Sequence, residues 1–151
     1  MRIGVISDTH GLLRPEAVSA LTGVDHILHA GDVGNPAILD ALGAIAPLTA
    51  IRGNIDRTKR CSQLPATEMV ELGGFTFYVV HDLKQLDLDP VPAGIGVVVS
   101  GHSHQPFIDW RKGVLYLNPG SAGPRRFSLP VSLATVDTSG SAPRAEIILL
   151  K

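Results

Sequence analysis

Five short apolar segments of this chain each end in a side chain that can bind a metal ion. The first runs from Ile3 to Ile6 and the last from Ile95 to Val99. Nearly continuous apolar runs of this kind are typical of strands buried on both faces of a parallel sheet. The side chains that follow the segments are Asp8 with His10, Asp32, Asn54, His81, and His102 with His104. Because open α/β sheets bind ligands at the carboxyl ends of their strands, this repetition predicts one site.

The donor chemistry of these side chains indicates a metal site. Carboxylate, amide oxygen and imidazole together suit borderline metals, with manganese favoured over zinc, iron, nickel or cobalt. Cys61, the single cysteine, stands apart from the segments, so no thiolate competes. Seven ligands are too many for one ion but suit two divalent ions that share a carboxylate. Two such ions would offset the repulsion between Asp8 and Asp32 and attract a phosphate anion. For any one motif alone, the alternative is a polar turn at the surface.

Capping and turn residues predict the elements between these segments. Pro15 is placed to start a helix that ends at Leu21, and Asn35 and Pro36 are an N-cap and a first helical residue for a second helix that runs to Ile45. Gly73-Gly74 lies between two extended runs, which predicts a hairpin. Further extended pairs are expected at 107–110 with 114–117 and at 131–136 with 145–150.

Length and composition restrict the classes of protein that fit. The 151 residues suit a single domain spanning 1–151, and the net charge of −1 without a basic run argues against a nucleic-acid binder that works by charge alone. The lone Cys61 favours the reducing cytoplasm. The apolar runs are shorter than the roughly 18 residues of a membrane span, so no membrane partner is expected.

Five motifs follow one another along the chain: DTH, GDV, GNID, a strand-ending His and GHSH. In this order they resemble the motifs of the calcineurin-like metallophosphoesterases. The similarity runs from Ile3 to Ser121 and includes the Asn-Pro-Gly-Ser that begins at Asn118. It points to the small single-domain phosphodiesterase branch of bacteria and archaea. The resemblance implies an α/β fold, a four-layer αββα sandwich of two mixed β-sheets, with the metals in the loops at one end.

The resemblance also implies a role for each ligand. The first metal would be held by Asp8, His10, Asp32 and His104. Asp32 would bridge to a second metal held by Asn54, His81 and His102. The implied reaction is hydrolysis of a small phosphate ester, with a diester favoured, by a hydroxide that bridges the two metals. Asp32, Asn54 and His81 would act at the reacting centre, and Arg125 and Asp56 are candidate substrate contacts. Asp56 has the alternative role of orienting the loop of Asn54.

Two positions depart from the family pattern. Ile55 stands where many larger relatives have a histidine that assists the leaving group, so hydrolysis of poor leaving groups is in doubt. Asp82 stands where the family usually has glycine, and it either orients His81 or is a solvated carboxylate. The helix that follows in relatives is reduced here to roughly Leu83 to Leu88. His29, near the motifs, is expected to be a hydrogen-bonded core histidine rather than a ligand.

Two other functions compete with that of an enzyme. The same fold serves as the phosphoesterase-like subunit of the retromer coat, a scaffold whose metal site is degenerate, and the complete ligand set ranks the enzyme above this alternative. Some relatives are nucleases, but the net charge and the chain length, with no room for a domain that grips a duplex, argue against that activity. A homo-oligomer is compatible with the sequence.

Overall fold

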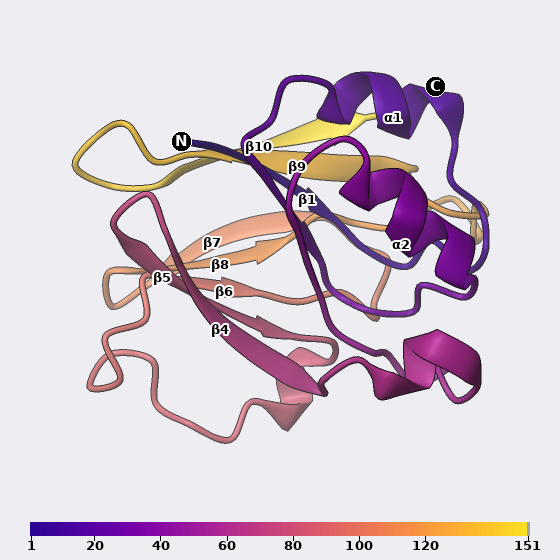
Figure 1. The fold of residues 1–151 in the computed structure, drawn as a ribbon. Helices are drawn as coiled ribbons and strands as arrows, with labels where there is room; N and C mark the ends of the chain where they lie inside the picture. The colour runs from indigo at the N-terminus through magenta and orange to yellow at the C-terminus, as the bar shows by residue number, and fades with distance from the viewer. Residues whose placement is uncertain (151) are drawn as a thin grey trace.

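A computed structural model describes residues 1–150, except for the side chain of Lys59, and contains two five-stranded sheets (Figure 1). The first sheet has the order β10-β9-β1-β2-β3, and the second has the order β4-β5-β6-β8-β7. In the first sheet the strands are β1 (Arg2–Ile6), β2 (His26–His29), β3 (Leu48–Ala50), β9 (Ser132–Asp137) and β10 (Arg144–Leu149). In the second they are β4 (Thr67–Leu72), β5 (Phe75–Val80), β6 (Val97–Val99), β7 (Phe107–Arg111) and β8 (Val114–Asn118). The predicted segments and hairpins are therefore confirmed.

Both sheets are mixed, and each has a parallel centre. β1, β2 and β3 are parallel. At one side β9 pairs antiparallel with β1, and β10 pairs antiparallel with β9. β5, β6 and β8 are parallel, and β4 and β7 pair with them antiparallel at the two edges. The expected fold class, a sandwich of two mixed sheets, is confirmed. Strands that run in the same direction bring their carboxyl ends to the same edge, where the predicted motifs begin.

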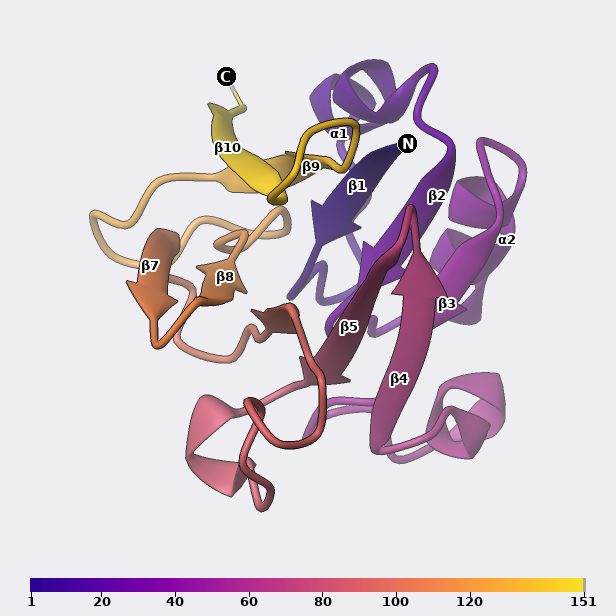
Figure 2. The same ribbon diagram turned by 90° about the vertical axis from the view of Figure 1, so that its left-hand side faces the viewer.

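The core between the sheets is built from side chains that alternate along the strands. Ile3 and Val5 of β1 share this core with Phe77 and Val79 of β5, and all four side chains are fully buried. The ribbon of β5 lies below that of β1 in Figure 2. Full burial of one such side chain stabilises the fold by about 1.5–3 kcal/mol. Ile6, the next residue along β1, belongs to a separate apolar cluster on the outer face of the first sheet.

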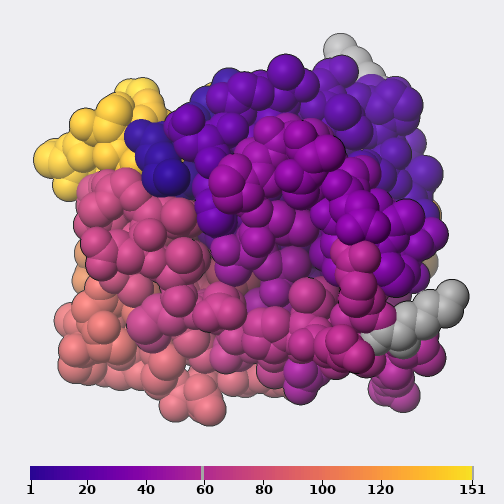
Figure 3. Space-filling view, in the orientation of Figure 1, coloured from indigo at the N-terminus to yellow at the C-terminus, as the bar shows by residue number. Residues whose placement is uncertain are grey.

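Two helices cover that outer face, α1 (Pro15–Leu21) and α2 (Pro36–Gly43). Both start at the predicted proline, and the Asn35 side chain accepts a hydrogen bond from the backbone N–H of Ala37 at 3.0 Å, as a helix N-cap does. Leu21 and Leu42 are completely buried against the sheet. In Figure 3 the N-terminal segments, in indigo and purple, lie above the segments coloured magenta and orange.

The outer face of the second sheet has a much thinner cover. The segment between β5 and β6 holds a short 3-10 turn, η2 (Leu83–Gln85), where the sequence predicts only a short helical turn. Leu83, Leu86 and Leu88 pack there against a cluster that contains Tyr78 and Tyr116. A second 3-10 turn, η1 (Lys59–Gln63), was not predicted. Within the described residues, no helix has the length and apolar character needed to span a membrane.

Candidate metal centre

The structure brings the side chains that end the five predicted strands into one cluster. Their donor atoms link in two overlapping groups, each with all atoms within 4.8 Å of one another: Asp8, His10 and His104, and Asp8, Asp32 and His81. Asn54 joins through its Oδ1, which lies 3.1 Å from His81 Nε2. His102 joins through its ring, whose centroid is 5.2 Å from that of His81.

Asp8, at the end of β1, divides its two carboxylate oxygens between the fold and the cluster. Oδ2 accepts hydrogen bonds from the Ser7 hydroxyl at 2.6 Å and from the backbone N–H of His102 at 3.1 Å. Oδ1 faces His104 Nε2 at 3.4 Å and His10 Nε2 at 3.7 Å. The carboxylate is completely buried. One oxygen therefore fixes the side chain, while the other is left for a ligand.

Asp32, after β2, is divided in the same way. Its Oδ1 accepts a hydrogen bond from the backbone N–H of Ile55 at 3.1 Å. Its Oδ2 lies 3.2 Å from His81 Nε2 and 3.4 Å from His10 Nε2. The free oxygen thus stands between an imidazole from each of the two sheets. This is the position that a bridging carboxylate requires.

His81, at the end of β5, has its tautomer set by the backbone. Its Nδ1 lies 2.7 Å from the carbonyl oxygen of Ala30, which only accepts hydrogen bonds, so Nδ1 carries the proton. In the neutral ring, Nε2 then carries the lone pair and faces the Asn54 amide, which can turn its NH₂ group towards it, and Asp32 Oδ2. A backbone carbonyl that orients a ring in this way is a common partner of metal-binding histidines.

The cluster has buried donor atoms with no hydrogen-bond partner among the described residues. These atoms are Asp8 Oδ1, His10 Nε2 and His104 Nδ1. An unpaired buried polar group costs about 1–3 kcal/mol, so native proteins rarely leave several together. Divalent cations would satisfy the converging oxygens and ring nitrogens, and the residues present therefore fit the two ions expected from the sequence.

Backbone strain is concentrated at the same residues. Five of the predicted ligands have a positive φ in the left-handed region: Asp8 (56°), His10 (46°), Asp32 (57°), His102 (69°) and His104 (61°). This conformation is uncommon for residues other than glycine and clusters at functional sites. Close packing adds a second constraint, because a Cβ added at Gly53 would collide with Asp32 Oδ1, and one at Gly101 with Ser7 Oγ.

The pKa values of the cluster follow from these contacts. Burial alone would raise the pKa of Asp8, but His10, His104 and the Ser7 hydroxyl outweigh it and hold that pKa far below its usual value. The pKa of Asp32 is lowered as well, since His81 and the Ile55 N–H overcome the effect of burial. Burial would lower the pKa of His81, yet its contacts with the two carboxylates raise it. Both carboxylates are therefore held ionised.

Asp56 is buried beneath the cluster and does not face it. Its carboxylate accepts backbone N–H groups from Val33 and Gly34, both at 3.0 Å, and from Gly53 at 2.9 Å. These bonds tie the loop of Asp32 to the loop of Asn54. Of the two roles expected for Asp56, the geometry favours orienting the loops over contacting a substrate. Arg125 is exposed and its Nε donates to the carbonyl of Leu129 at 3.4 Å.

His29 and Asp82 also have defined places. His29 is fully buried; its Nδ1 accepts the N–H of Gly31 at 3.1 Å, so Nε2 carries the proton and donates to Thr9 Oγ1 at 3.0 Å. The prediction of a hydrogen-bonded core histidine is confirmed. The Asp82 carboxylate faces His102 Nε2 at 3.8 Å, while Ala30 orients His81. Asp82 is therefore neither the partner of His81 nor a free solvated group.

The sequence interpretation missed the supports of the GHSH turn. The Asn118 Nδ2 donates to the carbonyl of Gly101 at 2.9 Å and to Ser103 Oγ at 3.2 Å. Ser121 Oγ donates to the carbonyl of Asp8 at 3.0 Å. Both residues belong to the Asn-Pro-Gly-Ser that follows β8. Its position directly after a strand was the signal that could have identified it as a support of the site.

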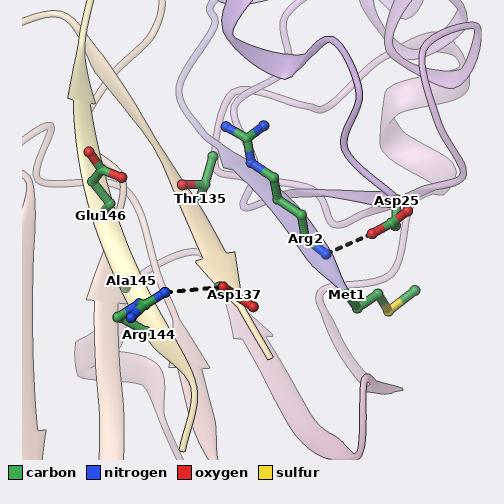
Figure 4. A pocket seen from close by; sticks show the side chains of 8 residues that line it. All are labelled: Met1, Arg2, Asp25, Thr135, Asp137, Arg144, Ala145 and Glu146. Carbon is green, nitrogen blue, oxygen red and sulfur yellow. Dashed lines mark hydrogen bonds and ion pairs between the residues drawn. The ribbon is translucent and has the colours of Figure 1, made fainter. Parts of the chain in front are cut away.

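Two cavities border the cluster, and another lies at the far end of the first sheet. Those beside the cluster have volumes of about 340 and 360 Å³, and both are lined by Asp82 and His102. The distant one, of about 630 Å³, opens at the amino end of β1 around Arg2, Asp25 and Arg144 (Figure 4). None of the seven predicted ligands lines this distant cavity. Two of its charged side chains, Arg144 and Asp137, form an ion pair at 3.2 Å.

Comparison with known proteins agrees with this geometry. Residues 1–141 match the model of the calcineurin-like phosphoesterase superfamily domain. The chain is 39% identical over 160 residues to a probable metallophosphoesterase of Methanothermobacter thermautotrophicus, covering 98% of this chain and 92% of the relative. It is 40% identical over 134 residues to a probable metallophosphoesterase of Methanocaldococcus jannaschii, covering 80% and 68%. The chain therefore belongs to the calcineurin-like phosphoesterase superfamily, a family of divalent-metal-dependent proteins.

Solved structures share the fold at low sequence identity. An archaeal phosphodiesterase superposes with a TM-score of 0.81 at 23% identity, covering 98% of this chain and all of that protein. Vps29 of Chaetomium thermophilum superposes with a TM-score of 0.80 at 18% identity, covering 100% and 97%. Vps29 of Entamoeba histolytica, solved as a complex with Zn²⁺, has a TM-score of 0.73 at 20% identity over the whole of both chains. The likeness supports the sandwich fold.

Proposed function

We propose that this protein is a phosphodiesterase that uses two divalent metal ions to hydrolyse a small phosphate ester. The observation that carries the proposal is the convergence of ligand atoms from Asp8, His10, Asp32, His81 and His104, with Asn54 beside His81. Asp8 Oδ1 and His10 Nε2 are buried there without a hydrogen-bond partner among the described residues. Membership of the calcineurin-like phosphoesterase superfamily supports it.

In this proposal the cluster holds two ions. Asp8, His10 and His104 would bind the first ion together with Asp32, and Asp32 would also contribute to a second ion held by Asn54, His81 and His102. Manganese is the favoured metal, with zinc, iron, nickel and cobalt also suited to this mixture of oxygen and nitrogen donors. When bound, such a pair of ions supplies a hydroxide nucleophile at neutral pH and polarises the phosphoryl oxygens.

The protein's own side chains would position this chemistry. The fixed Nδ1–H of His81 leaves Nε2 free as a ligand, and the Ile55 N–H holds Asp32 Oδ1, so that Oδ2 faces both neighbouring imidazoles. The Ile55 side chain, which is 43% exposed, has no proton to give to a leaving group. We therefore expect faster turnover of esters with good leaving groups, such as aryl esters, with Arg125 as the candidate contact for the substrate phosphate.

A scaffold without enzymatic activity is the second candidate. The fold that this chain shares with Vps29 favours the scaffold. The surroundings of His10 and Asp8 argue for metal binding in either case, so metal content alone does not separate the two functions. Hydrolysis does. Location in the cytoplasm, inferred from the lone buried Cys61, is part of the proposal.

The test is hydrolysis of bis(4-nitrophenyl) phosphate by the purified protein with added Mn²⁺. We expect turnover that depends on the metal and falls roughly 1,000-fold or more in Asp32→Asn, because that variant weakens the bridge between both ions. Asp25→Asn is a matched control, since Asp25 accepts the N–H of Arg2 at 2.7 Å at the opposite end of the same sheet. No hydrolysis by the wild type, or equal rates in wild type and Asp32→Asn, would contradict the proposal.

A further inference from the structure

The carboxylate of Asp82 borders both cavities beside the candidate metal centre. The cavity of about 340 Å³ is lined on its polar side by Arg52, Asn54, His81, Asp82, Gln85 and His102. The cavity of about 360 Å³ includes Leu83, Lys84 and Phe107 and shares with the first only Asp82 and His102. A phosphate ester held at the metals would therefore have this carboxylate close by, whichever cavity its substituents occupy.

The position of this charge is fixed by the fold. Asp82 Oδ1 accepts the backbone N–H of Lys84 at 3.1 Å, which caps η2. Oδ2 lies 3.8 Å from His102 Nε2, and the side chain is 24% exposed. One oxygen thus anchors the carboxylate, and the other presents a negative charge beside an imidazole that is itself 46% exposed.

The surrounding charges suit a ligand with one negative charge. Arg52 is the cation that lines the first cavity, and its Nη1 donates to the carbonyl of Leu64 at 2.7 Å. Lys84 is the cation that lines the second. The negative charge of Asp82 opposes the attraction that each of these two cations exerts on an anionic ligand. A phosphomonoester carries up to two negative charges at neutral pH, whereas a diester carries one, so repulsion by a fixed carboxylate weighs more heavily on the monoester.

We propose that Asp82 is a specificity-determining residue that favours singly charged phosphodiesters over doubly charged phosphomonoesters by electrostatic repulsion. The inference rests on the proposed function, which it deepens by assigning diester preference to one side chain. It is independent of how the metals are divided among their ligands.

The variant Asp82→Asn tests the charge alone, because the amide oxygen remains available to the N–H of Lys84. We compare bis(4-nitrophenyl) phosphate with 4-nitrophenyl phosphate at pH 8 in the manganese-loaded protein. In Asp82→Asn we expect kcat/KM for the monoester to rise about tenfold and that for the diester about threefold, because Coulomb repulsion scales with the charge of the ester. Both rises should shrink in about 0.5 M salt. Asp89→Asn is the matched control, since Asp89 accepts the N–H of Val91 at 3.3 Å in the same segment and is not among the residues that line either cavity.

A binding measurement separates this inference from the proposed function. By calorimetry, inorganic phosphate should bind about tenfold more tightly to Asp82→Asn than to the wild type, and dimethyl phosphate, with half the charge, only about threefold more tightly. A parallel fall in kcat/KM for both esters would mean that Asp82 positions His102, and would overturn the inference. If the wild type hydrolyses neither ester, the proposed function fails; equal phosphate affinities in wild type and variant would then overturn the charge inference by themselves.

Discussion

The two sides of the candidate metal centre differ in how they meet the solvent. The closed half, formed by Asp8, His10 and His104, has side chains that are 0%, 19% and 4% exposed. The open half, formed by Asn54, His81 and His102, has an exposed amide and a His102 ring that is 46% exposed. Both neighbouring cavities border the open half. We therefore expect the closed half to retain an ion and the open half to admit a substrate.

The backbone shows the same difference. All three residues of the closed half have a positive φ, whereas in the open half only His102 does. Strained conformations persist only where surrounding contacts hold them, and Ser7, Ser121 and the N–H of His102 supply those contacts around Asp8. Asp32 lies between the halves and contacts an imidazole from each. The two halves are thus expected to respond separately to mutation.

The largest expected effect is the loss of one ion from one half. His104→Ala should remove the ion of the closed half, and His102→Ala the ion of the open half, each lowering the metal content from two ions per chain towards one. Activity should fall roughly 1,000-fold in both, because both ions act on the same phosphate. Elemental analysis after dialysis gives the stoichiometry, and a shift in the spectrum of the cobalt-loaded protein distinguishes which ion remains.

His26→Ala is the matched control for these variants. His26 bonds to Thr49 at 2.8 Å at the start of β2, away from the cluster, and its loss should leave two ions bound. Equal loss of both ions in His102→Ala and His104→Ala would show that the halves are not separate sites.

A smaller effect is expected where Asp56 supports the centre from below. Asp56→Asn would weaken three bonds to backbone N–H groups and place an NH₂ group against at least one of those donors. The loops of Asp32 and Asn54 would then shift relative to each other, while the closed half keeps its own supports. We expect metal affinity to fall by about 10- to 100-fold, the usual size for a residue that orients ligands.

Metal titration followed by calorimetry measures this affinity. The open-half ion should weaken more than the closed-half ion. Asp40→Asn, which removes an exposed ion pair with Arg60 at 2.8 Å, is the control and should bind metal as the wild type does. A uniform weakening of both ions by Asp56→Asn would contradict the separate support of the two halves.

Local sequence signals predicted most of the fold and the cluster. Pro15 and Asn35-Pro36 define helix starts through contacts within a few residues, and Gly73-Gly74 defines a hairpin in the same way. The cluster was predictable because a side chain that can bind a metal follows each of the five strands. The role of Asp56 was not decidable, since its three N–H partners lie on two loops about 20 residues apart in the chain. In the same way, the direction in which the Asp82 side chain points depends on how the segment that carries Asp82 packs against the segment that carries His102.

The 3-10 turn at Lys59–Gln63 shows the same limit on a smaller scale. Its residues are polar and lack helical periodicity, so nothing local predicts it. Cys61 is its buried member and packs into the cluster under α2. This contact joins segments distant in the chain, and it becomes visible only when the first sheet and its helices are assembled.

The smallest expected effect is a pH dependence of stability beneath the closed half. Burial lowers the pKa of His29 to about 4, although the nearby carboxylates oppose this shift. In the unfolded chain a histidine has its ordinary pKa near 6.5. Between these values the unfolded chain binds a proton that the folded protein does not. The free energy of unfolding should therefore fall as the pH drops from 6.5 to 4, by about 1.4 kcal/mol per pH unit, and His29 should contribute no dependence above 6.5.

Urea unfolding of the metal-free protein at pH 7 and pH 5 measures this dependence, with His29→Gln as the comparison. Other groups of the cluster titrate in both proteins, so the difference between the two isolates His29. The wild type should lose about 2 kcal/mol more than His29→Gln on acidification. His26→Gln should lose nearly as much as the wild type, because His26 is only partly buried and its pKa is lowered by burial alone. Equal losses in wild type and His29→Gln would mean that water reaches His29 and that the layer under the closed half is not dry. The contrast between the two halves would then reduce to the exposure of His102.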